Sequence, residues 1–110
     1  MQILEDQIED VYILKLVDRL DSNTAPELEK KINEIIERGL NRMIIDLEKI
    51  ESLSSAGLRV ILGAIKEFNR TAGKLVICSA SEKVGEIFQR AGFNSFLPIV
   101  PTLDDAIKDF

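Results

Sequence analysis

Histidine is missing from all 110 residues of the sequence. Without an imidazole the chain cannot build a Ser-His-Asp or Cys-His relay, a zinc site of the zincin type or an imidazole general base. Tryptophan is also missing, and the single cysteine, Cys78, cannot form an internal disulfide. These absences argue against a hydrolase, and the cysteine usage favours a reducing cytoplasm.

Long apolar runs and basic clusters are missing as well. No stretch approaches the roughly 18 to 20 apolar residues of a membrane span, and the start from Met1 to Asp6 lacks the features of a signal peptide. The 14 Lys and Arg are scattered among 19 Asp and Glu, for a net charge of -5. Nucleic-acid binding needs a concentrated basic surface. We therefore expect a cytoplasmic protein that binds neither membranes nor nucleic acids.

Motifs for nucleotide binding and catalysis are also lacking. Neither GxxxxGK[ST] nor GxGxxG occurs, so ATP is not expected to be this chain's own ligand. Cys78 lies in an apolar segment without a nearby base, which predicts an inert buried thiol. Because no nucleophile and base are paired, we expect no enzymatic activity, no cofactor and no metal site.

What is present is the composition of one soluble domain, residues 1–110, with 45% hydrophobic and 30% charged residues. Apolar runs rich in β-branched residues predict strands, and apolar residues at helical spacing behind a Ser or Thr cap predict helices. The predicted strands are 2–8, 11–17, 43–47, 74–78 and 96–100, and the predicted helix caps are Thr24, Ser54 or Ser55, Ser81 and Thr102. This alternation predicts an α/β fold with a mixed, largely parallel sheet flanked by about four helices.

Local signals give more specific predictions for the first two helices. Thr24 is expected to cap the first helix, with Pro26 in the first turn and Glu27 completing a capping box. The second helix, roughly 55–69, is expected to turn one apolar face inward: Leu58, Ile61, Leu62, Ile65 and Phe68. Glycine costs about 1 kcal/mol in an exposed helix interior. We therefore expect Gly63 to lie against the sheet or another helix, so that Gly63→Leu destabilises the fold by overpacking.

The most informative segment is Ser52-Leu53-Ser54-Ser55-Ala56-Gly57-Leu58, which joins a buried strand to an amphipathic helix. A hydroxyl at this point lies at the positive end of the helix dipole, beside unpaired backbone N–H groups that tolerate a phosphate. The local residues alone favour a simpler interpretation, in which Ser54 or Ser55 only caps the helix. Gly57 is a candidate for close approach of another group.

The stretch from Ile50 to Gly63 resembles the signature of STAS domains, in particular bacterial anti-sigma factor antagonists. The usual form of that signature is Asp-Ser-Ser/Ala-Gly-Leu followed by an apolar helix. Leu20-Asp21-Ser22-Asn23-Thr24-Ala25 is similar to the family's Leu-Asp-x-x-Thr/Ser-Ala loop, and Met43-Ile44-Ile45-Asp46-Leu47 to its preceding strand. The resemblance covers essentially the whole chain and implies a mixed sheet flanked by helices.

The resemblance assigns roles to particular residues. Ser55 matches the serine that is phosphorylated in the family, and Asp21 matches a loop acid that lies beside it and helps to bind the kinase. Two residues depart from the family pattern: Ser54 replaces the usual Asp, which leaves a second candidate hydroxyl, and Asp18 replaces a usual Gly. We interpret Asp18 as a local backbone variation. The expected partner-binding surface comprises Asp21, Ser22, Asn23, Ser54, Ser55, Gly57 and Arg59.

The function that the resemblance implies is a non-catalytic switch. Unphosphorylated, the chain would bind an anti-sigma factor that is also a serine kinase and so release a sigma factor. Phosphorylation of Ser55 would end this binding, and a PP2C-type phosphatase would reset it. The alternative is a STAS regulatory or structural subunit of a stressosome, transporter or lipid-transport assembly. We expect a monomer or a weak dimer, and we expect charge reversal at Asp21 to weaken binding while leaving thermal stability nearly unchanged.

Overall fold

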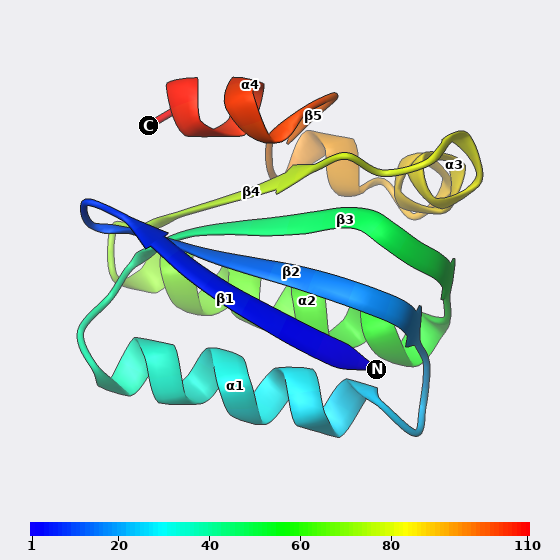
Figure 1. Ribbon diagram of the computed structural model, residues 1–110, viewed down its shortest axis with the longest axis horizontal. Helices are drawn as coiled ribbons and strands as arrows, with labels where there is room; N and C mark the ends of the chain where they lie inside the picture. The colour runs from blue at the N-terminus through cyan, green and yellow to red at the C-terminus, as the bar shows by residue number, and fades with distance from the viewer.

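A five-stranded sheet of order β1-β2-β3-β4-β5 forms the centre of the protein (Figure 1). The computed structural model describes residues 1–110. The strands are β1 (Gln2–Ile8), β2 (Val11–Leu20), β3 (Arg42–Leu53), β4 (Lys74–Cys78) and β5 (Ile99–Val100). The helices are α1 (Ala25–Glu37), α2 (Ser55–Arg70), α3 (Glu82–Arg90), α4 (Leu103–Lys108) and the short 3-10 helix η1 (Phe93–Ser95). Because β1 and β2 are antiparallel and the other neighbours are parallel, the predicted mixed, largely parallel sheet is confirmed.

The two faces of the sheet are covered unequally. In Figure 1, α1 and α2 lie side by side below the sheet and α4 lies above it. Alternate residues of the central strands, such as Leu14 and Ile45, join the large core with α1, α2 and α3. The opposite set, such as Ile13 and Ile44, forms a smaller core that includes Ala106 of α4. The larger core therefore lies between the sheet and the layer formed by α1 and α2.

β2 and β3 are both longer than the sequence predicts. β2 continues to Leu20 and β3 to Leu53, beyond the predicted ends at residues 17 and 47. Their pairing is interrupted by register shifts, and the exposed residues at these ends include Asp18, Arg19 and Glu48. Because these polar residues break the apolar pattern, the strand ends read as loops in the sequence.

The last strand is shorter than predicted. Of residues 96–100 only Ile99 and Val100 pair with β4, and Phe96 follows the short helix η1. Pro98 has no N–H to donate to a sheet, although its carbonyl accepts a hydrogen bond from the Ile77 N–H at 3.0 Å. Other boundaries are confirmed: the Ser81 and Thr102 hydroxyls cap their helices, accepting from the N–H groups three residues later.

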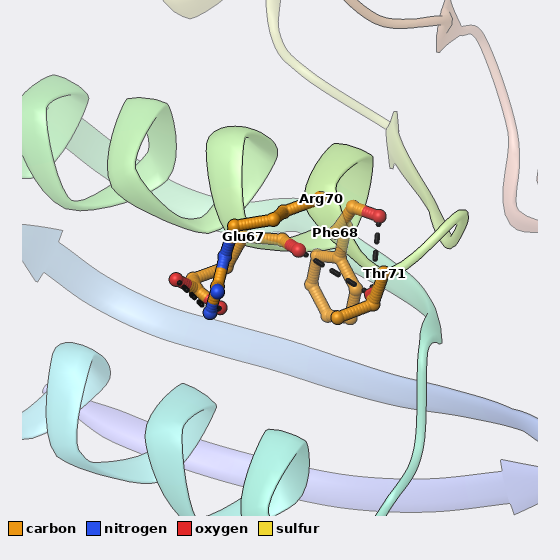
Figure 2. A network of polar contacts seen from close by, with 4 residues as sticks. All are labelled: Glu67, Phe68, Arg70 and Thr71. Carbon is orange, nitrogen blue, oxygen red and sulfur yellow. Dashed lines mark hydrogen bonds and ion pairs between the residues drawn. The ribbon is translucent and has the colours of Figure 1, made fainter.

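Helix α2 is fixed at both ends by hydroxyl side chains. Ser54 is the N-cap residue, and at the other end the Thr71 hydroxyl donates to the carbonyls of Glu67 and Phe68 at 3.3 and 3.2 Å. Figure 2 shows the Thr71 contacts and the ion pair that joins Arg70 to Glu67, one turn earlier, at 2.8 Å. The ends of α2 therefore have hydrogen-bond partners where the ladder of the helix runs out.

The inward face of α2 is confirmed in part. Ile61, Ile65 and Phe68 are buried, as predicted, whereas Leu58 and Leu62 are only half-buried. Small residues complete the buried face, because Gly57 and Ala64 let the helix pack closely. The prediction for Gly63 was wrong: Gly63 is exposed, and a Cβ added there would have no atom within 4 Å.

Candidate partner-binding and phosphorylation site

The ends of β2 and β3 bring the two predicted site segments together. These strands are parallel neighbours, so their carboxyl ends lie at the same edge of the sheet. The Ser54 N–H donates to the carbonyl of Leu20 at 2.9 Å. This hydrogen bond ties the start of α2 to the end of β2, where the loop to α1 begins. The prediction that both segments meet at one sheet edge is therefore confirmed.

The loop before α1 is organised by Asp21 rather than by Thr24. The Asp21 carboxylate accepts hydrogen bonds from the N–H groups of Asn23 and Thr24 at 3.0 and 3.2 Å. The Thr24 hydroxyl accepts from the Asp21 N–H and donates to the Arg19 carbonyl, both at 2.9 Å. Thr24 therefore makes no side-chain cap to α1, and the predicted capping box is wrong. Because the short Asp21 side chain accepts the N–H groups of the turn, the Thr24 hydroxyl binds the backbone of Arg19 and Asp21 and not that of α1.

These contacts change the expectation for charge reversal at Asp21. Partial desolvation raises the pKa of its carboxyl, but hydrogen bonds from Asn23 and Thr24 and the charge of Arg19 outweigh it, so the pKa lies below its ordinary value. A lysine at this position would lose the hydrogen bonds that close the loop. The structure therefore revises the expectation of nearly unchanged thermal stability: because Asp21 closes the turn in the free protein, charge reversal is now expected to lower the thermal midpoint as well.

Ser54 and Ser55 occupy different positions at the start of α2. The Ser54 Oγ accepts a hydrogen bond from the Gly57 N–H at 3.4 Å, so this hydroxyl is the helix cap. Ser55 is the first helical residue; it is exposed, and its hydroxyl makes no side-chain hydrogen bond within the chain. Of the two serines, the structure therefore presents Ser55 to solvent with its Oγ unengaged.

Gly57 lies at a close approach between α2 and the two strand ends. A Cβ added at Gly57 would lie 2.6 Å from Leu20 Cγ and 2.9 Å from Leu53 Cδ1. Both leucines belong to the core, so they cannot move aside freely. Gly57 therefore serves to seat the start of α2. Leu20 and Leu53 belong to the quoted motifs but not to the predicted site, although each is the last apolar residue before a predicted site loop.

A shallow hollow of about 330 Å³ joins the loop to α2. Ser22 and Arg59, two predicted site residues, both line it, whereas Asn23 is exposed outside the lining. The other lining residues are Ala25, Pro26, Glu29, Ala56 and Val60. The sequence analysis missed these five, although residues three or four apart on a helix share one face. This spacing could have pointed to them, because Ala25 and Glu29 are four apart on α1, and Ala56 and Val60 are four apart on α2.

The backbone explains why a glycine is usual in the family at the position of Asp18. Asp18 has a φ of +86°, in the left-handed region that side chains disfavour and glycine adopts freely. Aspartate tolerates this region better than most residues. The interpretation of Asp18 as a local backbone variation is supported by its place beside a register shift in β2.

The family model of the STAS domain matches residues 2–106. The chain belongs to the STAS family. This STAS domain is 32% identical to the Bordetella bronchiseptica protein named "Putative anti-sigma factor antagonist BtrV" over all 110 residues, which is 100% of this chain and 95% of the relative.

Solved structures confirm the STAS fold. An anti-sigma factor antagonist from Mycobacterium paratuberculosis superposes with a TM-score of 0.90 at 24% identity, covering 98% of this chain and 92% of that one. The Bacillus cell fate determinant SpoIIAA in its phosphorylated form superposes with a TM-score of 0.79 at 21% identity, covering 98% of each chain. At these identities the likeness establishes the architecture of the domain.

Other kinds of site find little support in this STAS domain. No group of three or more Cys, Asp or Glu is placed to hold a metal ion. Burial raises the pKa of the Cys78 thiol to about 11, so the thiol stays protonated and unreactive. None of the helices has both the length and the apolar character to cross a membrane. The surface around Ser55 therefore remains the strongest candidate site.

Proposed function

We propose that this STAS domain is a non-catalytic anti-sigma factor antagonist of the cytoplasm. In its unphosphorylated state it binds an anti-sigma factor that is a serine kinase, and this binding releases a sigma factor. The kinase, with its own ATP and Mg²⁺, phosphorylates Ser55 and so ends the complex, and a PP2C-type phosphatase restores Ser55. The observation that carries the proposal is the exposed Ser55 hydroxyl at the start of α2, beside a loop shaped by Asp21.

The choice of Ser55 over Ser54 rests on their hydrogen bonds. The Ser54 Oγ accepts the Gly57 N–H, so phosphorylation there would disrupt the cap. A kinase needs a hydroxyl that can enter its active site, and Ser55 is exposed without such a bond. Relatives named as anti-sigma factor antagonists support the proposed role of the chain, and a neighbour solved in a phosphorylated form supports phosphorylation as the switch.

The fold can accept a phosphate at Ser55 without rearranging. A phosphoserine adds about -1.5 to -2 charges and meets backbone donors and the positive dipole end at a helix N-terminus. Arg59 lies one turn along the same face of α2, is exposed and has no ion-pair partner within the chain. The penalty therefore falls on the complex, where the new charge and bulk lie at the centre of the contact.

The test uses the serine-kinase anti-sigma factor recovered with the chain from its source cell and then purified. With ATP and Mg²⁺ the kinase is expected to label wild type and Ser54→Ala but not Ser55→Ala. Ser55→Ala should still bind, whereas Ser55→Asp or full phosphorylation should weaken binding by at least about 100-fold with an unchanged circular dichroism spectrum.

Three results would contradict the proposal. Mass spectrometry could place the phosphate on Ser54, or stoichiometric phosphorylation could leave the affinity unchanged. Recovery of stressosome or membrane-transport subunits in place of a kinase would instead support the alternative role of the domain as a subunit of such an assembly. A PP2C-type phosphatase that removes the label from Ser55 would complete the cycle.

A further inference from the structure

A second hollow lies between α1 and α2, of about 140 Å³. Its apolar lining includes Ile32, Ile36, Val60 and Ala64, and Gly63 lies among them. It shares Glu29 and Val60 with the hollow lined by Ser22 and Arg59. The two hollows are therefore neighbours, and we call them together the α1/α2 groove, which begins beside the proposed partner surface and follows both helices away from it.

Gly63 is the unexplained residue of this groove. It lies in the interior of α2, where glycine is less favourable than alanine because of the backbone freedom lost on folding. No packing requires it, since a Cβ built at Gly63 would have no atom within 4 Å. Because Gly63 has no side chain, the space between α1 and α2 stays open at this position.

The rim of the groove carries charges of both signs: Glu29 and Glu67 line it, and Arg59 lies at the end beside the proposed partner surface. Glu29 is exposed on α1 and makes no ion pair within the chain. Glu67 on α2 lines the groove too, but Arg70 already holds its carboxylate, as Figure 2 shows. A basic group of a partner would therefore find its free counterpart at Glu29, at the end of the groove nearer to Arg59.

We propose that the α1/α2 groove receives one large apolar side chain of the bound anti-sigma factor, with a neighbouring basic residue against Glu29. Gly63 would then determine which partner fits. The hollow beside Gly63, of about 140 Å³, suits the apolar side chain, because a cavity of about 150 Å³ holds a benzene ring. This inference rests on the proposed function and extends its contact surface, since one end of the groove is the hollow lined by Ser22 and Arg59.

The test compares two helical glycines, Gly63 and Gly85, at which an added Cβ would meet open space. Gly63→Leu fills the groove, whereas Gly85→Leu in α3 adds the same side chain outside it. The probe is the purified anti-sigma factor kinase, titrated by calorimetry onto each unphosphorylated variant. We expect Gly63→Leu to raise Kd about tenfold or more and Gly85→Leu to leave it unchanged.

The outcomes separate this inference from the proposed function. If wild type binds the kinase and Gly63→Leu, folded by circular dichroism, binds equally well, the groove inference is overturned while the proposed function stands. If wild type does not bind, both are overturned. Should Gly63→Leu not fold, Asn33→Trp gives the same test, because it places a much larger side chain on the facing wall of the groove. An equal loss of affinity in Gly85→Leu also counts against the groove.

Discussion

At the residue scale, two adjacent serines divide two tasks between them. Ser54 holds the end of α2 through its Oγ, and Ser55 leaves its Oγ free. A substitution at each should therefore have a different effect on the free protein. Ser54→Ala is expected to lower the free energy of unfolding by about 0.5–1 kcal/mol through loss of the cap, whereas Ser55→Ala should change it by less than about 0.5 kcal/mol.

Urea denaturation of both serine variants checks this division. The Ser54→Ala midpoint should fall and the Ser55→Ala midpoint should stay near that of wild type, with equal slopes. A larger loss of stability in Ser55→Ala would show that its hydroxyl is structural after all.

Asp18 carries strain that can be removed. Its φ of +86° is costly for any residue with a Cβ, by roughly 1–2 kcal/mol. Asp18→Gly is therefore expected to raise the thermal midpoint, although the greater freedom of glycine in the unfolded chain offsets part of the gain. Glu51→Gly is the matched control, an exposed residue of β3 without positive φ, and it should lower the midpoint. Equal destabilisation by both changes would argue that Asp18 is unstrained.

Asp21 predicts a pH dependence of stability. Because its pKa in the folded protein lies below the ordinary value of 3.8, its ionised form is favoured by folding. That contribution is complete above the unfolded pKa and is lost as the pH falls through the folded one. Acid unfolding of Asp21→Asn should therefore show a smaller loss of stability than wild type below pH 3.8. At higher pH, where Asp21 is ionised in both the folded and the unfolded chain, the two profiles should run parallel.

At the element scale, α2 contains two glycines with opposite structural roles. Gly57→Ala would place a methyl group within 3.0 Å of both Leu20 and Leu53 and should destabilise the fold by about 1–3 kcal/mol. Gly63→Ala meets nothing and should stabilise it by up to about 1 kcal/mol. Chemical denaturation of the two variants gives the comparison directly. If both variants changed the free energy of unfolding in the same direction, the contrast between a crowded Gly57 and an open Gly63 would be contradicted.

The elements that the sequence predicts well are those with one dominant physical signal. The apolar runs of β3 and β4 and the caps Ser81 and Thr102 are local features, and the structure confirms them. Thr24 was misjudged because Asp21, three residues earlier, competes for the same turn. Such competition between adjacent polar residues is resolved by backbone geometry, which residue types alone do not determine.

The candidate site could be located from the sequence, but its shape could not. The resemblance marked Asp21 and Ser55, and the parallel pairing of β2 and β3 follows from the order of elements. The groove beyond Arg59 depends on how far apart α1 and α2 pack. That spacing depends on many core side chains together and cannot be predicted from any one of them. For this reason Gly63 was predicted to lie at a buried contact, although it lies at an open groove.

At the scale of the whole molecule, the smaller core under α4 protects Cys78. Burial keeps the pKa of this thiol at about 11, so in the folded protein its reaction with iodoacetamide should be slow and should still accelerate above pH 9.0. Ala106→Glu places a charge in that core and should expose the thiol, whereas Lys108→Glu on the outer face of α4 should not. Fast labelling of the wild type at neutral pH would contradict this protection.

The order of the strands in the sheet also bears on how the chain is made. Each strand pairs with the strand that comes next in the sequence, from β1 to β5. During synthesis from the amino terminus, every emerging strand therefore finds its partner edge already assembled, and no strand waits unpaired for a distant one. Each parallel pair still closes a connection that contains at least one helix, so the strand order spares the chain the larger entropy cost of closing two or more such connections at once.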